Sequence, residues 1–377
     1  MRGRPDEVSR SVTRREFLQR AAVVAAVPSA LGAAASPARA AASEQRDQAR
    51  AKVSCQKAIW IGSRLGGDPD GTRRELDRLG AAGFKLLLPL VKGSQSVDFR
   101  TNVGTVNPEY PAWDPLAVLL KEASARSMVV HPWFVVFDEE TGSPLLATHP
   151  QYAAVFDRGS GWACACQPGV QEYELALCQS VLENYPVRGV HLDYIRTGGW
   201  CRCAYCTEEM KHRGVDIHAV RPHEGGPGRM AWGEGHAAWG EWRAGRVTDF
   251  VTRLHASLQP KKVEISAAVF PEYPGCMLDE GQDWVAWADQ GILEYIFPMT
   301  YVDSTREARM RARCHRALVG PRPQLWEGLG KSSSHSELST RTMLDQAKAC
   351  VEEGSQGIVF FSHSALTDED VSALSTL

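Results

Sequence analysis

The chain has 377 residues, of which 44% are hydrophobic, with 42 Lys and Arg against 45 Asp and Glu and a formal net charge of −3. This slightly acidic balance argues against a nucleic acid or an anionic membrane surface as the partner. The length suits one large domain, such as a barrel with insertions, better than two small domains.

The N-terminal region has the features of an export signal. Arg14 and Arg15 precede a weakly apolar stretch over 21–35, and an Ala-Arg-Ala triplet follows at 38–40. This order is typical of a twin-arginine (Tat) signal peptide. We therefore expect a periplasmic or extracellular protein. The predicted organisation is a signal peptide over 1–40, a linker over 41–56 and a single domain over 57–377.

Removal of the signal leaves 35 basic and 42 acidic residues, a net charge of −7, which strengthens the case against nucleic acid. The apolar stretch contains Pro28 and Gly32 and is too short to anchor the protein in a membrane. No later segment has the uninterrupted apolar length needed for a membrane span.

Short apolar runs then alternate with amphipathic stretches along the chain. The runs predict eight strands, over 58–62, 84–90, 128–137, 187–195, 263–270, 293–301, 323–328 and 357–362. The amphipathic stretches predict helices over 71–82, 114–127, 171–184, 235–258, 284–290, 305–318, 338–353 and 367–377. Eight strand–helix units with parallel-type runs predict an α/β fold, a (β/α)₈ TIM barrel.

The main alternative is an open, doubly wound sheet, which requires a glycine-rich phosphate turn after its first strand. The segment 61–67 lacks the G-x-G-x-x-G spacing, so we favour the barrel. Three βα loops are long, those after strands 2, 3 and 4 (92–113, 138–168 and 197–234). In a barrel, such loops build the active-site face.

The fourth predicted strand carries a carboxylate at its C-terminal end. Alternation along the strand places His191 and Asp193 on the side of the barrel lumen, with the apolar residues between them on the other side. Barrel enzymes keep catalytic groups at this end of a strand, so Asp193 is a candidate catalytic residue. A structural ion pair with Arg196 is the alternative, because a buried carboxylate requires a partner.

Other strand ends add polar and aromatic residues to the same face. The candidates are His131, Trp133, Tyr194, Glu272, Tyr301, Asp303 and Glu327. A sugar site needs aromatic surfaces and two carboxyl groups, one to protonate the leaving oxygen and one to act as nucleophile or base. This collection therefore favours a cleft that binds carbohydrate.

Four segments resemble the glycosyl hydrolase-like family 10 of bacterial secreted proteins. They are Val187–Arg196, Val130–Phe134, Gln282–Trp284 and Pro298–Tyr301, and the similarity extends over about 57–366. The resemblance implies a TIM barrel, export and glycosidase activity, with peptidoglycan glycan strands lacking stem peptides as a candidate substrate. It also implies that Asp193 is catalytic.

The sequence does not identify the second catalytic carboxylate. The chitinase-type motif would place a Glu two residues beyond Asp193, where this chain has Ile195. Glu272 and Asp303 are the candidates, with Glu327 third. His191 and Arg196 are expected to keep Asp193 ionised, since nearby positive charge lowers a carboxyl pKa. Trp133 and Tyr301 are expected to form platforms for the sugar.

Five of the ten cysteines lie in two neighbouring βα loops. They are Cys164, Cys166, Cys201, Cys203 and Cys206. In an exported protein, disulfides that hold the two loops are one interpretation. A structural zinc ion is the other, because Tat export of a folded protein would permit a metal loaded before export. No cofactor is expected to be required for the chemistry.

We therefore predict an exported glycoside hydrolase acting on a polysaccharide. One alternative is a carbohydrate-binding barrel without turnover, which would lack a second carboxylate near Asp193. A metal-dependent hydrolase such as a deacetylase is a weaker alternative, because the first predicted strand lacks the H-x-H motif of metal-dependent amidohydrolase barrels.

Overall fold

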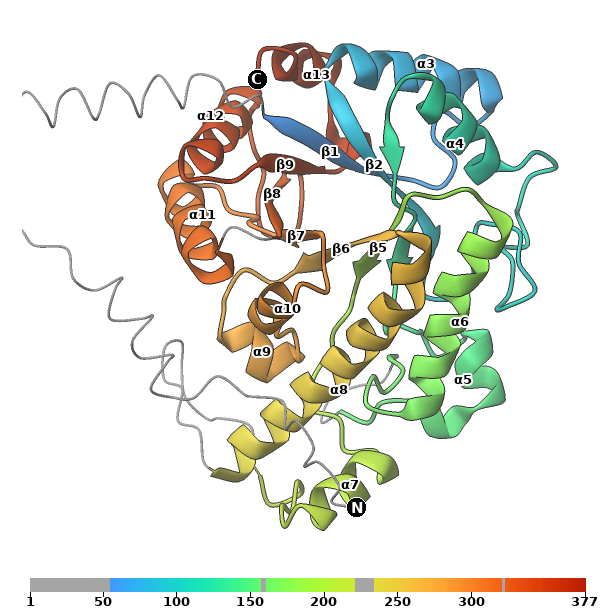
Figure 1. Ribbon diagram of the computed structural model, residues 1–377, viewed down its shortest axis with the longest axis vertical. Helices are drawn as coiled ribbons and strands as arrows, with labels where there is room; N and C mark the ends of the chain where they lie inside the picture. The colour runs from blue at the N-terminus through green and yellow to red at the C-terminus, as the bar shows by residue number, and fades with distance from the viewer. Residues whose placement is uncertain (1–54, 157–160, 221–233, 321–322) are drawn as a thin grey trace, which may run out of the picture. The chain divides into compact units, whose positions relative to one another are not determined.

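A computed structural model describes residues 55–156, 161–220, 234–320 and 323–377. The expected signal peptide and nearly all of the expected linker lie outside these residues. Figure 1 shows a ring of strands surrounded by helices. The strands are all parallel and form one closed sheet, because β1 pairs with both β2 and β9. The predicted TIM barrel is confirmed.

All eight predicted barrel strands are present, and the third is divided into two pieces. The strands are β1 (Gln56–Ile61), β2 (Phe84–Lys92), β3 (Val129–Val130), β4 (Trp133–Val135), β5 (Gly189–Asp193), β6 (Glu264–Val269), β7 (Tyr295–Pro298), β8 (Gln324–Gly330) and β9 (Gly357–Phe361). The break falls at His131 and Pro132, and proline cannot donate to a sheet ladder. Pairing continues across it, since His131 N donates to Leu87 O (3.0 Å) and Pro132 O accepts from His191 N (2.8 Å).

The eight predicted helices surround the barrel. They are α3 (Pro69–Ala81), α4 (Pro115–Ala125), α6 (Pro168–Asn184), α8 (Glu234–Leu258), α10 (Trp284–Gln290), α11 (Thr305–Val319), α12 (Thr340–Glu352) and α13 (Asp368–Leu374). Three short helices not expected from the sequence lie in the loops after β4, β5 and β6: α5 (Pro144–Thr148), α7 (Ala204–His212) and α9 (Gly275–Glu280). None of the helices in the described ranges is long and apolar enough to cross a membrane.

The strands separate two apolar layers. The lumen is filled by Ala58, Trp60, Leu86, Leu88, Ala268, Phe297, Trp326 and Val359. The other faces of the strands pack on the helices in a larger core, which contains Leu325 and Leu329 of β8. Because side chains alternate along a strand, Trp326 and Glu327 must face opposite sides.

Glu327 therefore points outward, away from the lumen, which corrects its expected place in the sugar site. Its carboxylate accepts from Thr300 Oγ1 (2.6 Å) and pairs with His315 Nδ1 of α11 (3.0 Å). His315 Nε2 in turn lies 3.0 Å from Pro271 O. The pKa of His315 is raised, because the attraction of Glu327 outweighs the opposing effect of burial. This pair fastens α11 to the barrel.

We expect Glu327→Gln to destabilise the fold by about 3 kcal/mol without abolishing any activity of the folded protein. Because the His315 pKa is raised in the folded protein, the pair adds its full stabilisation to the free energy of unfolding below pH 6.5. This stabilisation is lost as the pH rises through the folded-state pKa of His315. Denaturant unfolding at about pH 6 and pH 9 would measure this. The control is Glu272→Gln, whose exposed ion pair should contribute less than about 1 kcal/mol. Equal losses in the two variants would contradict the assignment.

Candidate active site

Asp193 is the last residue of β5 and its side chain is buried at the C-terminal end of the barrel. The residue is 6% exposed. Its Oδ1 accepts a hydrogen bond from the Tyr194 backbone N–H (2.7 Å) and lies 4.0 Å from Arg196 Nη1. Tyr194 has a φ of 51°, a left-handed conformation that is unusual for a non-glycine residue. Such backbone conformations cluster at functional sites.

The pKa of Asp193 is raised. Burial has the largest effect and outweighs Arg196, the Tyr194 N–H and the Trp133 indole, all of which favour the ionised form. Arg196 thus has the expected effect on the Asp193 pKa, but burial outweighs it. His191 does not supply positive charge, because burial lowers its own pKa well below the usual range and leaves the ring neutral. A carboxylate with a raised pKa is a stronger base than an ordinary aspartate.

Arg196 lies at the centre of a group of aromatic rings. Its guanidinium carbon is 4.1 Å from the ring centroid of Tyr194, 4.7 Å from that of Phe270 and 5.5 Å from that of Trp162. The Nη1 atom is buried and makes no hydrogen bond within the described part of the chain. This donor beside Asp193 therefore has hydrogen-bonding capacity that the described residues do not use.

Two further carboxylates interact with Arg196, Asp138 and Glu280. Burial raises the pKa of each, and Arg196 is the strongest opposing influence on both. Asp138 follows the third barrel strand, and its charge also acts on the Tyr194 phenol together with that of Asp193. Glu280 is the last residue of α9. Three carboxyl groups therefore lie within electrostatic reach of the Arg196 guanidinium, and Lys92 and Arg243 also act on Asp138 and Glu280 respectively.

Neither of these carboxylates was among the candidates expected from the sequence. Asp138 directly follows the predicted strand 128–137, so the argument that singled out Asp193 would also have found it. Glu280 lies on an insertion helix whose existence the sequence pattern did not predict.

Lys92 holds the ends of the neighbouring strands in place beside Asp138. Its buried Nζ donates to the carbonyls of Val135 (2.5 Å) and Val136 (2.9 Å) and pairs with the carboxylates of Glu139 (2.6 Å) and Glu174 (3.0 Å). These contacts join the end of β2 to the segment that leads to Asp138.

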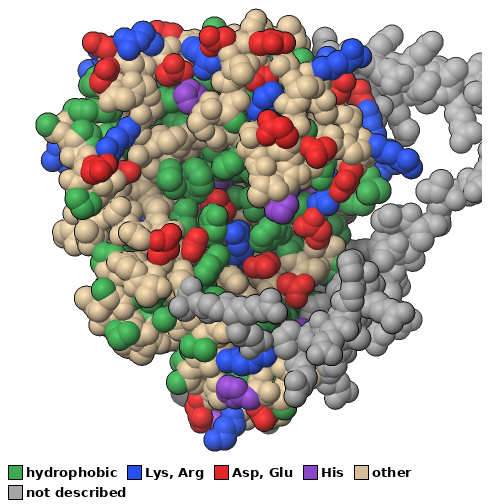
Figure 2. Space-filling view, turned by 180° about the vertical axis from the view of Figure 1, so that it is seen from behind, with side chains coloured by type: hydrophobic (Ala, Val, Ile, Leu, Met, Phe, Trp, Pro, Cys, Tyr) green, Lys and Arg blue, Asp and Glu red, His purple; other side chains and the backbone are tan. Residues whose placement is uncertain are grey.

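Trp133 and Tyr301, the expected platforms for the sugar, lie within electrostatic reach of Asp193. Trp133 affects the Asp193 pKa, and Asp193 and Tyr194 contribute to the raised pKa of Tyr301, for which burial is the main cause. Trp162, which was not expected, packs on Tyr194 with ring centroids 5.7 Å apart. One face of the molecule is hollowed at its centre, where hydrophobic side chains surround a few charged ones (Figure 2).

His191 and His131 occupy deeper layers of the lumen instead of contacting Asp193. Trp60 Nε1 donates to His191 Nε2 (2.9 Å), and the Oγ atom of Ser266 lies 3.0 Å from His191 Nδ1 and 3.1 Å from His131 Nδ1. His131 Nε2 is 3.3 Å from Glu264 Oε2 at the start of β6. These contacts give every ring nitrogen of the two histidines a hydrogen-bond partner. We therefore expect the two side chains to support the floor of the site.

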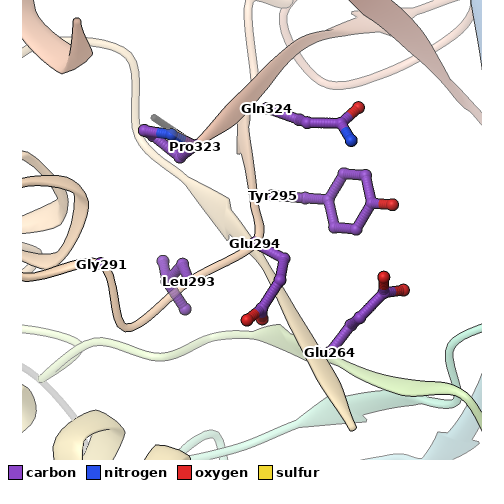
Figure 3. A pocket seen from close by; sticks show the side chains of 7 residues that line it. All are labelled: Glu264, Gly291, Leu293, Glu294, Tyr295, Pro323 and Gln324. Carbon is purple, nitrogen blue, oxygen red and sulfur yellow. The ribbon is translucent and has the colours of Figure 1, made fainter. Parts of the chain in front are cut away.

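A shallow hollow of about 360 Å³ lies at the opposite end of the barrel (Figure 3). Glu264, Tyr295 and Gln324 line it, and these are the first residues of β6, β7 and β8. It is therefore separated from Asp193 by the length of a strand.

Glu272 and Asp303, the expected second carboxylates, are both exposed and are engaged elsewhere. Glu272 pairs with Arg311 of α11, and Asp303 accepts from the Glu337 backbone N–H (2.9 Å). In the described residues, neither has a contact with Asp193 or Arg196. Asp138 and Glu280, by contrast, interact electrostatically with Arg196.

Four of the five loop cysteines can hold a metal ion. They are Cys164, Cys201, Cys203 and Cys206, and their sulfur atoms lie within 4.8 Å of one another. All ten cysteines of the chain are free thiols in the structure, so the expected disulfides are not formed there.

We expect Asp193→Asn to stabilise the fold by about 1 kcal/mol at neutral pH. The raised folded-state pKa means that ionising the buried group reduces stability, and this effect develops as pH rises from 3.8 through the folded-state value. The gain should therefore disappear below pH 3.8. Chemical denaturation across this range would measure it, and a loss of stability at neutral pH would show that the attraction of Arg196 outweighs burial.

Comparison with known proteins is consistent with this geometry. The profile of the family "Glycosyl hydrolase-like 10" matches residues 93–318, more than half of the chain. The sequence is 25% identical over 232 residues to "Glycosyl hydrolase DigH" of Escherichia coli and of Shigella flexneri, covering 53% of this chain and 49% of the relative. The chain thus spans about half the length of these relatives.

Solved structures share the fold at low identity. The glycoside hydrolase domain of PgaB (BpsB) from Bordetella bronchiseptica is 12% identical, with a TM-score of 0.67 over 85% of this chain and 98% of that domain. The catalytic domain of the β-amylase from Paenibacillus polymyxa is 10% identical, with a TM-score of 0.60 over 85% of this chain and 97% of that domain.

The solved structures show the same barrel fold, and the family match agrees with the resemblance seen in the sequence. By its sequence over residues 93–318, the chain belongs to the glycosyl hydrolase-like 10 family.

Proposed function

We propose that the protein is an exported glycoside hydrolase that cleaves O-glycosidic bonds of a polysaccharide with Asp193 and Asp138. The observation that carries this proposal is the position of Asp193 at the end of β5, 4.0 Å from Arg196 and beside the strand that leads to Asp138. Two carboxyl groups at the carboxyl end of a barrel, next to aromatic rings, suit glycoside hydrolysis.

Asp193 acts as the ionised carboxylate in this mechanism. The Tyr194 N–H and Arg196 stabilise its negative charge, while burial makes it more basic than an ordinary aspartate. It attacks the anomeric carbon or removes a proton from the water that does so. Positive charge developing on the sugar ring would also be stabilised by this buried anion.

Asp138 donates the proton to the leaving oxygen. Burial and the nearby Glu140 raise its pKa, which favours the protonated form that a general acid requires. Glu280 is the second candidate for this role, because burial raises its pKa in the same way. The unsatisfied Arg196 donor would bind a hydroxyl group of the sugar between them.

The substrate we propose is the glycan of peptidoglycan. This rests on the resemblance to the family and on the expected Tat signal over 1–40, which would bring the enzyme to the cell wall. The mature net charge of −7 suits a carbohydrate partner better than a polyanion.

Carbohydrate binding without turnover is the competing function. The Arg196 side chain neutralises one charge among three carboxylates, so the group could also serve as a fixed binding surface. Removal of the proton-donating carboxylate should abolish hydrolysis but not binding, because binding does not need a proton donor.

The test uses the mature protein, residues 41–377, with peptide-free peptidoglycan strands and a panel of other polysaccharides. Mass spectrometry of the products detects new reducing ends. We expect Asp193→Asn to reduce the cleavage rate by about 1,000-fold or more and Asp138→Asn by about 100-fold or more. The controls are Asp303→Asn and Glu272→Gln, which should retain the wild-type rate.

A second experiment identifies which carboxyl group donates the proton. With a substrate whose leaving group needs no protonation, Asp138→Asn should recover most of its activity and Asp193→Asn should not. If Glu280→Gln shows the recovery instead, Glu280 is the donor. Unchanged cleavage by Asp193→Asn would contradict the mechanism, and glycan binding without cleavage by the folded wild type would establish the binding module.

A further inference from the structure

A compact group of thiols lies outside the carboxylate site, in the long loops that follow β4 and β5. Cys164 precedes α6, Cys201 and Cys203 precede α7, and Cys206 lies in the first turn of α7. All four are buried. Cys164 Sγ lies 3.5 Å from Cys206 Sγ and 3.7 Å from Cys203 Sγ, although 42 and 39 residues separate them in sequence.

The spacing of these sulfur atoms suits a single tetrahedral ion. Four thiolates bound to zinc at about 2.3 Å are separated from one another by about 3.8 Å. The observed separations of 3.5 and 3.7 Å are close to this value, and all four atoms fall within 4.8 Å of one another. Disulfide bonds would join the atoms only in pairs, at about 2.05 Å.

Hydrogen-bond donors already point at the sulfur atoms. Cys201 Sγ accepts from the backbone N–H groups of Val155 (3.3 Å) and Cys203 (3.4 Å), and Cys203 Sγ accepts from Gln167 Nε2 (3.7 Å). Donors of this kind orient metal-bound ligands and stabilise their negative charge. Neutral thiols would gain much less from them.

A buried guanidinium balances the charge that such a site would carry. Zinc with four thiolates has a net charge of −2. Arg243 is fully buried, and its charge interacts with Cys166 and Cys206 as well as with Glu280 and Asp279. Arg243 Nη2 donates to Thr197 Oγ1 (2.6 Å), but Nε and Nη1 have no hydrogen-bond partner within the described ranges. A buried cation left partly unpaired is costly unless a nearby anion compensates it.

The surrounding apolar residues form only a small cluster. The four cysteines pack with Cys166, Ala154, Met210, Ile217 and Trp239, apart from the main core of the barrel. Partly buried residues such as Phe156, Trp200 and Trp242 pack against this cluster, and small structural units of this kind commonly depend on a bound metal. Figure 1 shows α7 beside the first turns of α8, at the edge of the molecule.

We propose that Cys164, Cys201, Cys203 and Cys206 bind one structural zinc ion that joins the loops after β4 and β5. The site is closed, with four protein ligands and no position for a substrate, so the ion does not take part in chemistry. It positions Trp162, which lies two residues before Cys164 and packs on Arg196 and Tyr194. Nothing in this inference requires the protein to be a glycosidase.

The first experiment measures the metal content of the purified full chain by mass spectrometry of the digested protein. We expect one zinc per chain, and X-ray absorption should find four sulfur neighbours at about 2.3 Å. Iron as the stoichiometric metal would overturn the assignment to zinc. A metal-free chain with these cysteines oxidised to disulfides would overturn the site itself.

Variants test the ligand set. Cys203→Ser should reduce the zinc content at least about tenfold. Cys166→Ser is the matched control, because Cys166 is equally buried in the same loop as Cys164 but is not among the four ligands, and it should retain zinc. If Cys203→Ser does not fold, the wild-type absorption spectrum still decides the ligands. Loss of zinc from Cys166→Ser with retention in Cys203→Ser would overturn the ligand set.

Discussion

The site depends on the partly buried guanidinium of Arg196. Burial raises the pKa of Asp193, Asp138 and Glu280, so three ionised carboxylates could not share this space without a compensating charge. Arginine suits the position because it does not lose its proton and its flat group packs on aromatic rings. The rings of Tyr194, Phe270 and Trp162 hold it in place.

The barrel strands position Asp193 and Asp138, and the loops supply the other side chains of the site. Parallel closure of the sheet brings the ends of β4 and β5 together, with Val135 paired to Asp193, so Asp138 and Asp193 extend from a rigid edge. The loops supply Trp162 and the helix that carries Glu280. Trp162 packs against the cysteine cluster, which is separate from the main core, so a metal in that cluster would affect the site without touching the substrate.

Much of the architecture could be predicted from the sequence, because eight apolar runs alternate with eight amphipathic stretches. Asp193 followed from its place at a strand end. Glu327 was misplaced because both faces of a barrel strand are buried, and the apolar pattern around Leu325 and Trp326 does not tell which face meets the lumen. His191 does share the lumen side with Asp193, but Trp60 and Ser266 already satisfy its ring.

Contacts between distant segments could not be predicted. The sequence shows two groups of cysteines, but only the folded chain shows that four sulfur atoms converge and that Arg243 lies beside them. Glu280 and Trp162 belong to loops without regular periodicity, so their approach to Arg196 has no local sequence pattern.

The pH dependence of kcat/KM in the wild type and in Arg196→Gln tests the central role of this guanidinium most directly. If Arg196 opposes the effect of burial on Asp193, its removal raises the Asp193 pKa, and the acidic limb of the profile moves to higher pH. An acidic limb that stays in place, or moves to lower pH, in a folded variant would contradict the account.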